Sequence, residues 1–238
     1  MKNLVAITQP DFFPWLGSIE KIAATDTFIF LDHVTNRPND GLWTKRVKVI
    51  LNGEPKWLGV SLKKDPEREF VPINEMVIDY ENKFQVKHLS SIKQNYGKAP
   101  FFKDVFPLVE EVYEAGHTLI AKFNGHFILS LCKKLHISTQ VFYSSEMKPA
   151  SNSNELLIEL VKMVNGDAYL HGEGSLDYLN PALWEKENIC LVPQKFTHPV
   201  YPQFNTKEFQ KGLSVIDALM NCGFEQTSAL LRRPEDFR

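Results

Sequence analysis

Two short apolar runs near the start of the chain, residues 4–8 and 27–31, are separated by a segment with helical spacing of apolar residues. A strand that is buried on both faces consists almost entirely of apolar residues, and both runs have this character. Residues 15–25 carry apolar side chains three and four positions apart, which is typical of a helix covering a core. The pattern predicts a strand, a helix and a second strand, with both strands parallel and central in a helix-covered sheet.

A different pattern begins after residue 45. Residues 46–51 and 56–60 are strand-like runs on either side of Asn52-Gly53, the dipeptide most typical of tight hairpin turns. The pair Glu54-Pro55 lengthens the expected turn. We therefore predict an antiparallel hairpin here, followed by a short strand at residues 76–79.

The middle of the chain has helical periodicity, and the last third returns to alternating strands and helices. The expected helices span residues 82–96, 101–115, 117–135, 154–164 and 213–221, and the expected later strands span 139–143, 168–170 and 188–192. Gly223 marks the expected end of the last helix, and the polar residues from Arg232 onward are expected to fray. The predicted fold class is α/β: a central, mostly parallel sheet flanked by helices, with an inserted antiparallel β-hairpin and a helical middle segment, in one continuous domain over residues 1–238.

Composition and charge exclude several classes of protein. With 27 basic and 29 acidic residues the formal charge is −2, so no bulk field favours nucleic acid or an anionic membrane. No apolar run approaches the roughly 18 residues of a membrane span, and the first run is too short for a signal-peptide core. We therefore expect a cytoplasmic protein. Its three cysteines, Cys132, Cys190 and Cys222, are widely spaced and fit neither a disulfide framework nor a metal knuckle.

The loop after the first strand is the first candidate site. It holds Gln9, Asp11 and Trp15, and its prolines Pro10 and Pro14 restrict the backbone. Ligands of open α/β sheets bind at the carboxyl ends of the parallel strands, which is where this loop begins. The loop can present these side chains to a ligand, or its prolines and aromatic residues can simply fasten it to the core.

The second strand ends in Asp32 and His33, which we expect beside the first loop because consecutive parallel strands are usually neighbours. A histidine there can act as a base, with Asp32 orienting it or the substrate. The alternative is that Asp32 is a turn or cap residue. We predict that Gln9, Asp11, Trp15 and Asp32 line one cavity at the carboxyl edge of the sheet.

Two further groups are weaker candidates. His171 and Tyr178 flank a Gly-Glu-Gly stretch whose backbone amides could bind phosphate, although a tight strand-to-helix turn explains the glycines equally well. Arg46 and Trp57 belong to a basic and aromatic patch on the hairpin that could hold a diphosphate and stack on a base or sugar. Alternating basic residues on a hairpin are otherwise its solvated face.

Signatures of covalent or metal chemistry are missing from the sequence. Ser144-Ser145 lacks the flanking glycines of a nucleophile elbow, and the seven histidines form no pair with zinc-ligand spacing. We expect no cofactor, no bound metal and no cysteine adduct during turnover.

Several of these motifs together resemble one family. The resemblance rests on Gln9-Pro10, Phe13-Pro14-Trp15-Leu16-Gly17, Asp26, Phe28-Ile29-Phe30-Leu31-Asp32, Trp43, Arg46, Trp57-Leu58, Lys87-His88, Tyr96, Ala99-Pro100-Phe101-Phe102, Ser144-Ser145, Tyr169-Leu170, Tyr178-Leu179, Tyr201-Pro202-Gln203 and Asp217. From about residue 7 to residue 223 the chain resembles the WbqC-like family of bacterial proteins. The resemblance implies a role connected with O-antigen and other surface polysaccharides, and the attachment of acyl or aminoacyl groups to amino sugars.

The resemblance also implies which positions matter. The family tends to keep the positions of Gln9, Trp15, Asp32, Arg46, His88, Tyr178 and Gln203. His33 departs from the acidic residue expected after Asp32, and this favours His88 over His33 as the base. The alternative is that His88 is a helix-face histidine packed at the edge of the core.

We hypothesise a transferase that moves an acyl or aminoacyl group, from a free or carrier-bound donor, onto the amine of a nucleotide-linked amino sugar. Arg46 would hold phosphate, and Trp15 or Trp57 would stack on base or sugar. One alternative is a non-catalytic binding or scaffold protein of a polysaccharide assembly pathway. Another is a nucleotidyltransferase, which the lack of a complete phosphate-binding fingerprint disfavours.

Overall fold

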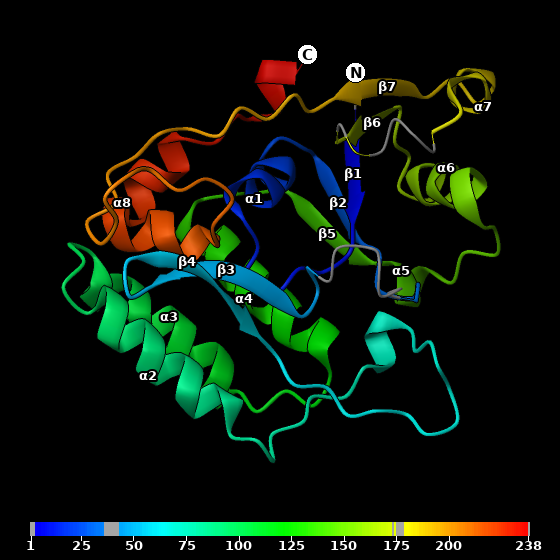
Figure 1. The fold of residues 1–238 in the computed structure, drawn as a ribbon. Helices are drawn as coiled ribbons and strands as arrows, with labels where there is room; N and C mark the ends of the chain where they lie inside the picture. Colours follow the sequence, from blue (N-terminus) through cyan, green and yellow to red (C-terminus); the bar gives the residue numbers. More distant parts are fainter. Residues whose placement is uncertain (1–2, 36–42, 173, 175–178, 238) are drawn as a thin grey trace.

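In the part of the chain that the structure describes, five parallel strands form the central sheet (Figure 1). The structure, a computed structural model, describes residues 3–35, 43–172, 174 and 179–237. The strands are β1 (Leu4–Thr8), β2 (Thr27–Phe30), β5 (Gln140–Tyr143), β6 (Ala168–His171) and β7 (Cys190–Pro193), in the spatial order β5-β2-β1-β6-β7. This confirms the α/β fold class, and it places β1 and β2 side by side and parallel as predicted.

The strand order determines where a ligand can bind. The chain first builds outward from β1 through β2 to β5, and it then returns to the other side of β1 to add β6 and β7. The connection after β1 therefore leads to β2 on one side, and the connection after β6 leads to β7 on the other side. In open α/β sheets this reversal opens a crevice outside the carboxyl ends of the two strands. The β1/β6 boundary is the topological switch point of this sheet.

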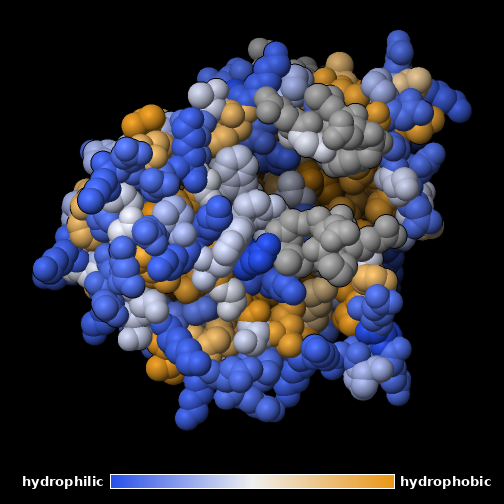
Figure 2. Space-filling view, viewed as in Figure 1, coloured by the Kyte–Doolittle hydropathy of each residue, from blue (hydrophilic) through white to orange (hydrophobic). Residues whose placement is uncertain are grey.

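Helices cover both faces of the sheet. Leu4 and Ala6 of β1 pack in one apolar cluster with α1 (Leu16–Ala23), α4 (Ile120–Lys134) and α8 (Val215–Ala229). Val5 and Ile7, which point to the opposite face, pack in a second cluster with α6 (Ser153–Met163) and α7 (Pro181–Lys186). Figure 2 shows the molecule from the same side as Figure 1, and it has a hollow with apolar walls near the place of β1 and α6 in Figure 1.

The predicted hairpin forms a separate two-stranded sheet of β3 (Arg46–Leu51) and β4 (Glu54–Gly59). Its turn is shorter than expected, because Asn52 and Gly53 both have positive φ, of 55° and 80°, and pairing resumes at Glu54. Pro55 is accommodated because β4 has a free edge where no amide is needed.

The middle of the chain is helical as predicted. It contains α2 (Phe84–Tyr96) and α3 (Phe102–Glu114), and shorter pieces elsewhere are η1 (Ile73–Glu75), α5 (Ser144–Met147) and η3 (Pro234–Phe237). Residues 76–79 make only isolated bridges, Leu62 with Ile78 and Val77 with Leu119, so the strand expected there does not form. No helix in the described parts of the chain is long and apolar enough to cross a membrane.

The C-terminal region differs from the prediction in two respects. Gly223, with φ 75° and ψ 177°, breaks the helical backbone of α8, but helical residues resume and continue to Ala229. A side chain at this position would collide with the ring of Phe101, so glycine serves both the kink and the close packing. Arg232 is held in place by hydrogen bonds to Glu20 and to the carbonyl of Gln194 rather than frayed.

Candidate functional site

A pocket of about 270 Å³ lies at the switch point. Its walls come from the end of β1 (Thr8), from α1 and its start (Trp15, Gly17, Ser18, Lys21), from the segment after β6 (Gly172, Gly174) and from the segment after β7 (Gln194, Lys195, Phe196). We call it the switch-point pocket. A larger pocket of about 730 Å³ lies on loop residues 62–77, away from the strand ends. We consider the switch-point pocket the better candidate because the strand order predicts a crevice there.

The loop between β1 and α1 is fastened to the core through its aromatic residues. Phe12 and Phe13 are fully buried, and the backbone amide of Phe12 donates to the carbonyl of Trp43. The side-chain amide of Asn124 donates to the carbonyl of Pro10 at 2.8 Å. This packing confirms the fastening role considered for the loop, and it leaves Asp11 at a fixed place between buried neighbours.

The indole ring of Trp15 packs directly against Gly17 at the start of α1. A Cβ atom on Gly17 would lie only 2.5 Å from Cη2 of the Trp15 ring. The other side of the indole meets Phe196, with ring centroids 5.0 Å apart in an edge-on arrangement. Glycine at position 17 thus allows the indole to lie over the helix start, as one wall of the pocket.

Asp11 and Lys21 give the pocket two titratable groups with shifted pKa values. Ser18 Oγ donates a hydrogen bond of 3.0 Å to Asp11 Oδ2. Burial raises the pKa of Asp11 to about 6, although Ser18 and the positive charge of Lys21 oppose the shift. Burial also lowers the pKa of Lys21 to about 8, opposed by the charge of Asp11. The two groups affect each other, but they form no ion pair within 4.0 Å.

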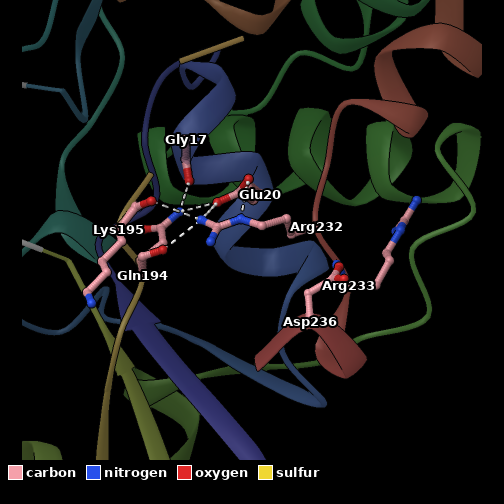
Figure 3. Close-up of polar contacts among 7 residues, drawn as sticks. All are labelled: Gly17, Glu20, Gln194, Lys195, Arg232, Arg233 and Asp236. Carbon is pink, nitrogen blue, oxygen red and sulfur yellow. Dashed lines mark hydrogen bonds and ion pairs between the residues drawn. The ribbon is translucent and has the colours of Figure 1, made fainter. Parts of the chain in front are cut away.

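An ion pair between the half-buried Arg232 and the buried Glu20 supports the wall of the pocket (Figure 3). Arg232 donates to Glu20 Oε1 and to the carbonyl of Gln194, both at 2.6 Å. Gln194 Nε2 in turn donates to the carbonyl of Gly17 at 2.8 Å. Figure 3 shows Arg232 between Glu20 and Gln194. The C-terminal segment thereby fixes the position of Lys195 against α1.

Asp32 and His33 lie in a second polar cluster, at the carboxyl ends of β2 and β5. Asp32 Oδ1 accepts hydrogen bonds from Ser144 Oγ and from the amide of Ser145, and Oδ2 accepts one from Ser145 Oγ at 2.7 Å. His33 Nδ1 lies 2.6 Å from Ser144 Oγ. Burial lowers the pKa of His33, with the charge of Asp32 opposing the shift. Asp32 bonds the serines rather than the imidazole, and Ser144 is fully buried, so the cluster ties two strand ends together and lacks the order of a catalytic triad.

His88 lies in the core, away from the strand ends. Its Nδ1 is 2.8 Å from the hydroxyl of Tyr113, and the ring also bonds the backbone of Gly59. Phe12 and Phe84 pack against the imidazole. Burial lowers the pKa of His88 to about 4. This placement matches the alternative of a core histidine, and it gives His88 no route to a substrate at the switch-point pocket.

Gln203 belongs to a buried network that we call the Asp217 cluster: Tyr96, Tyr201, Gln203 and Asp217. Asp217 is fully buried, and its Oδ2 accepts hydrogen bonds from Gln203 Nε2 at 2.8 Å and from the Tyr201 hydroxyl at 2.9 Å. Its Oδ1 accepts one from the Tyr96 hydroxyl at 2.9 Å. Four positions quoted for the family resemblance thus meet in one structural network.

The remaining predicted residues that the structure describes do not line the switch-point pocket. Gln9 Oε1 accepts a hydrogen bond of 3.4 Å from Thr44, and Arg46 stacks 4.3 Å from the Trp57 ring. His171 is buried at the end of β6. Tyr178 lies outside the described residues. Of the four residues expected in one cavity, Trp15 lines the switch-point pocket and Asp11 adjoins it through Ser18. Gln9 and Asp32 do not line it, and Asp32 instead bonds Ser144 and Ser145.

The sequence analysis missed the basic and amide groups of the pocket. Ser18 and Lys21 are three residues apart on α1 and therefore share one face of the helix, a signal that was available once the loop was suspected. Gln194 and Lys195 follow β7 directly, at the carboxyl edge where ligands bind. Among the described residues, no three His, Cys, Asp or Glu side chains are grouped as metal ligands.

Comparison with known proteins identifies relatives but gives no assigned activity. The model of the WbqC-like protein family matches residues 9–229. Uncharacterized protein Rv1507c of Mycobacterium tuberculosis is 25% identical over 224 residues, which is 93% of this chain and 94% of that protein. No solved structure matches the chain. The matched range includes most of the switch-point pocket and all of the Asp217 cluster.

Proposed function

This chain belongs to the WbqC-like protein family, and from that premise we propose that it is a transferase of surface-polysaccharide biosynthesis. Its reaction moves an acyl or aminoacyl group onto the amine of a nucleotide-linked amino sugar. Family membership supports the coarser statement, a role in polysaccharide biosynthesis. The transfer reaction is our own proposal, and the chemistry of the switch-point pocket supports it.

The observation that carries the proposal is a carboxyl group with a pKa near 6 beside the crevice where α/β sheets bind ligands. Amine acylation requires a base, because the attacking nitrogen loses a proton as it becomes an amide. Burial raises the pKa of Asp11 to about 6, a value suited to accepting that proton near neutral pH. Asp11 therefore takes the role for which the sequence suggested His88 or His33.

The reaction proceeds by direct attack. The amine nitrogen forms a bond to the acyl carbon, and the bond from that carbon to the donor's leaving group breaks. The amine proton passes to Asp11 and from there to the leaving group. Trp15 offers the sugar an aromatic face at the pocket wall, where Phe196 holds the indole in position.

The test is turnover measured by mass spectrometry. Purified protein is incubated with nucleotide-linked amino sugars and a panel of acyl thioester and aminoacyl donors, and the N-acylated product is quantified. We expect Asp11→Asn to reduce turnover about a hundredfold or more. Asp104→Asn, at an exposed position on α3, is the matched control and should leave turnover unchanged. Equal turnover by Asp11→Asn and the wild type would eliminate Asp11 as the base, and no product with any donor would contradict the transferase.

A non-catalytic ligand-binding or scaffold protein is the second candidate, and one observation favours it. Trp43 and Trp57 are 41% and 43% exposed, and their ring centroids lie 5.8 Å apart. Arg46 and Lys48 both stack on Trp57. Exposed indoles beside cations form a surface suited to acidic sugars. Trp57→Ala should weaken saccharide binding without affecting acyl transfer if this surface is the functional one.

A further inference from the structure

Lys21 lines the switch-point pocket, and its ammonium group has no partner among the described residues. In the described parts of the chain it makes no hydrogen bond, and no carboxylate lies within 4.0 Å of it. Lys21 Nζ is 3.3 Å from the place that a Cβ of Gly172 would occupy. The side chain thus reaches from α1 across the crevice to the segment after β6.

Such a position is unfavourable for a lysine unless something binds it. A lysine near a surface usually extends its ammonium into water and buries only its methylene groups. Lys21 is half-buried, and partial loss of water around its ammonium lowers its pKa to about 8. A buried charge is costly without a partner, and the protein supplies none in the described residues. An anionic ligand would provide the missing partner.

The surroundings of Lys21 favour a small anion. Gly172 and Gly174 line the pocket without side chains, so neither fills the space in front of Lys21. Lys195 adds a second positive charge at the wall, and Asp11 adds one negative charge nearby. The volume of about 270 Å³ is below the roughly 300–1,000 Å³ of sites that enclose a whole drug-sized ligand. The pocket therefore fits one compact charged group of a larger molecule.

We propose that Lys21 binds a phosphoryl group in the switch-point pocket, between the ends of β1 and β6. Assigning that group to the diphosphate of a nucleotide-linked sugar rests on the proposed function. The phosphate site itself rests on the unpartnered ammonium, the glycine walls and the second lysine. Phosphate oxygens accept charge-assisted hydrogen bonds from an ammonium group, which would stabilise the charge where it lies.

Calorimetric titration tests the proposal with three probes at constant ionic strength: inorganic phosphate, pyrophosphate and uridine diphosphate. We expect Lys21→Met to weaken binding of at least one probe tenfold or more, and Lys21→Arg to retain it within about threefold. Lys103→Met removes an exposed lysine of α3 and should bind as the wild type does. Near-ultraviolet circular dichroism verifies that each variant is folded. Lys21→Met removes no polar contact within the described residues, so it should fold.

The probes distinguish the source of the phosphoryl group. Tighter Lys21-dependent binding of uridine diphosphate than of pyrophosphate indicates a nucleotide, whereas equal affinities indicate free phosphate or diphosphate. Equal binding by the wild type and Lys21→Met, or no binding of any probe, overturns the site. Lys21-dependent binding without turnover would support the phosphate site and contradict the transferase. Turnover together with binding that does not depend on Lys21 would support the transferase and contradict the phosphate site.

Discussion

The Asp217 cluster contains a fully buried carboxyl group, and the half-buried carboxyl group of Asp11 adjoins the switch-point pocket. Burial raises the pKa of both groups, but their hydrogen bonds differ. Three side chains donate hydrogen bonds to Asp217, one to Oδ1 and two to Oδ2. Asp11 receives one hydrogen bond from a side chain, that of Ser18, and Lys21 receives no partner in the described residues. The charged group of the first region has several partners, and those of the second region have few.

This difference distinguishes polar groups that stabilise the fold from polar groups that are available to a ligand. A buried polar group that has all its partners stabilises one arrangement of the chain and needs nothing from outside. A buried charge without a partner destabilises the fold, and a protein tolerates it where binding or chemistry requires it. The positions that carry the family resemblance therefore have different roles in this structure. Gln203 supports the Asp217 cluster, whereas Trp15 forms a wall of the pocket.

The largest expected effect is that of Asp217→Ala. This substitution leaves Tyr96, Tyr201 and Gln203 without their common acceptor, and each buried donor that loses its partner is costly. We expect the free energy of unfolding to fall by about 3–5 kcal/mol, measured by urea denaturation. Asp104→Ala on the exposed surface of α3 is the control and should change it by less than about 0.5 kcal/mol. A loss below about 1 kcal/mol for Asp217→Ala would mean that the network contributes little.

The sequence predicted the parts of the fold whose signal is local. The apolar runs of β1 and β2 and the Asn52-Gly53 turn identify their structures without knowledge of distant neighbours. Gly223 carried a correct local signal for a break, but the helix resumes beyond it and continues to Ala229. Local pattern therefore determines element type better than it determines where an element ends.

The site was predicted only in part, because it depends on which strands become neighbours. Asp11 and Trp15 were found because they follow the first strand directly. Lys21 meets Gly172 only because β6 pairs with β1, and the sequence does not show this pairing. The same limit affected His88, whose contacts with Tyr113 and Gly59 come from tertiary packing that helical spacing does not reveal.

The second prediction is that Lys21→Met stabilises the protein at pH 7. Lys21 has a pKa of about 8 in the folded state, below the ordinary value near 10.4, so the cost of its burial is fully present below pH 8. The loss of its favourable field at Asp11 offsets part of the gain, and we expect a net increase of about 1–2 kcal/mol in the free energy of unfolding. Between about pH 8 and pH 10 the wild-type lysine loses its proton on folding, so the difference should shrink.

Urea denaturation at pH 7, 8, 9 and 10 measures this difference, with Lys103→Met as the control. The control variant should follow the wild type across the whole range, because Lys103 is exposed. If Lys21→Met is less stable than the wild type at pH 7, then Lys21 makes a favourable contact and the contrast with the Asp217 cluster is lost.

The third prediction concerns Asp11→Asn and the acidic range. The pKa of Asp11 is raised to about 6, so the cost of its buried charge is present above pH 6 and is relieved as the pH falls toward 4. The wild type should therefore gain stability relative to Asp11→Asn between pH 6 and pH 4. At pH 7 we expect Asp11→Asn to be more stable by about 1 kcal/mol, since loss of the attraction to Lys21 limits the benefit. Parallel stability curves for the two proteins over this range would show that Asp11 titrates normally.

The smallest expected effect is that of Ser18→Ala, which tests how little support Asp11 receives. The hydrogen bond from Ser18 Oγ favours the charged form of Asp11, so its removal should raise the pKa of Asp11 further above the ordinary value. Stability should change by less than about 1 kcal/mol, because one hydrogen bond is lost and the pocket is open to water. A carbon NMR titration of the Asp11 carboxyl group measures the shift, and Ser90→Ala on the exposed face of α2 is the control. A pKa that falls in Ser18→Ala would mean that the hydrogen bond from Ser18 does not favour the charged form of Asp11.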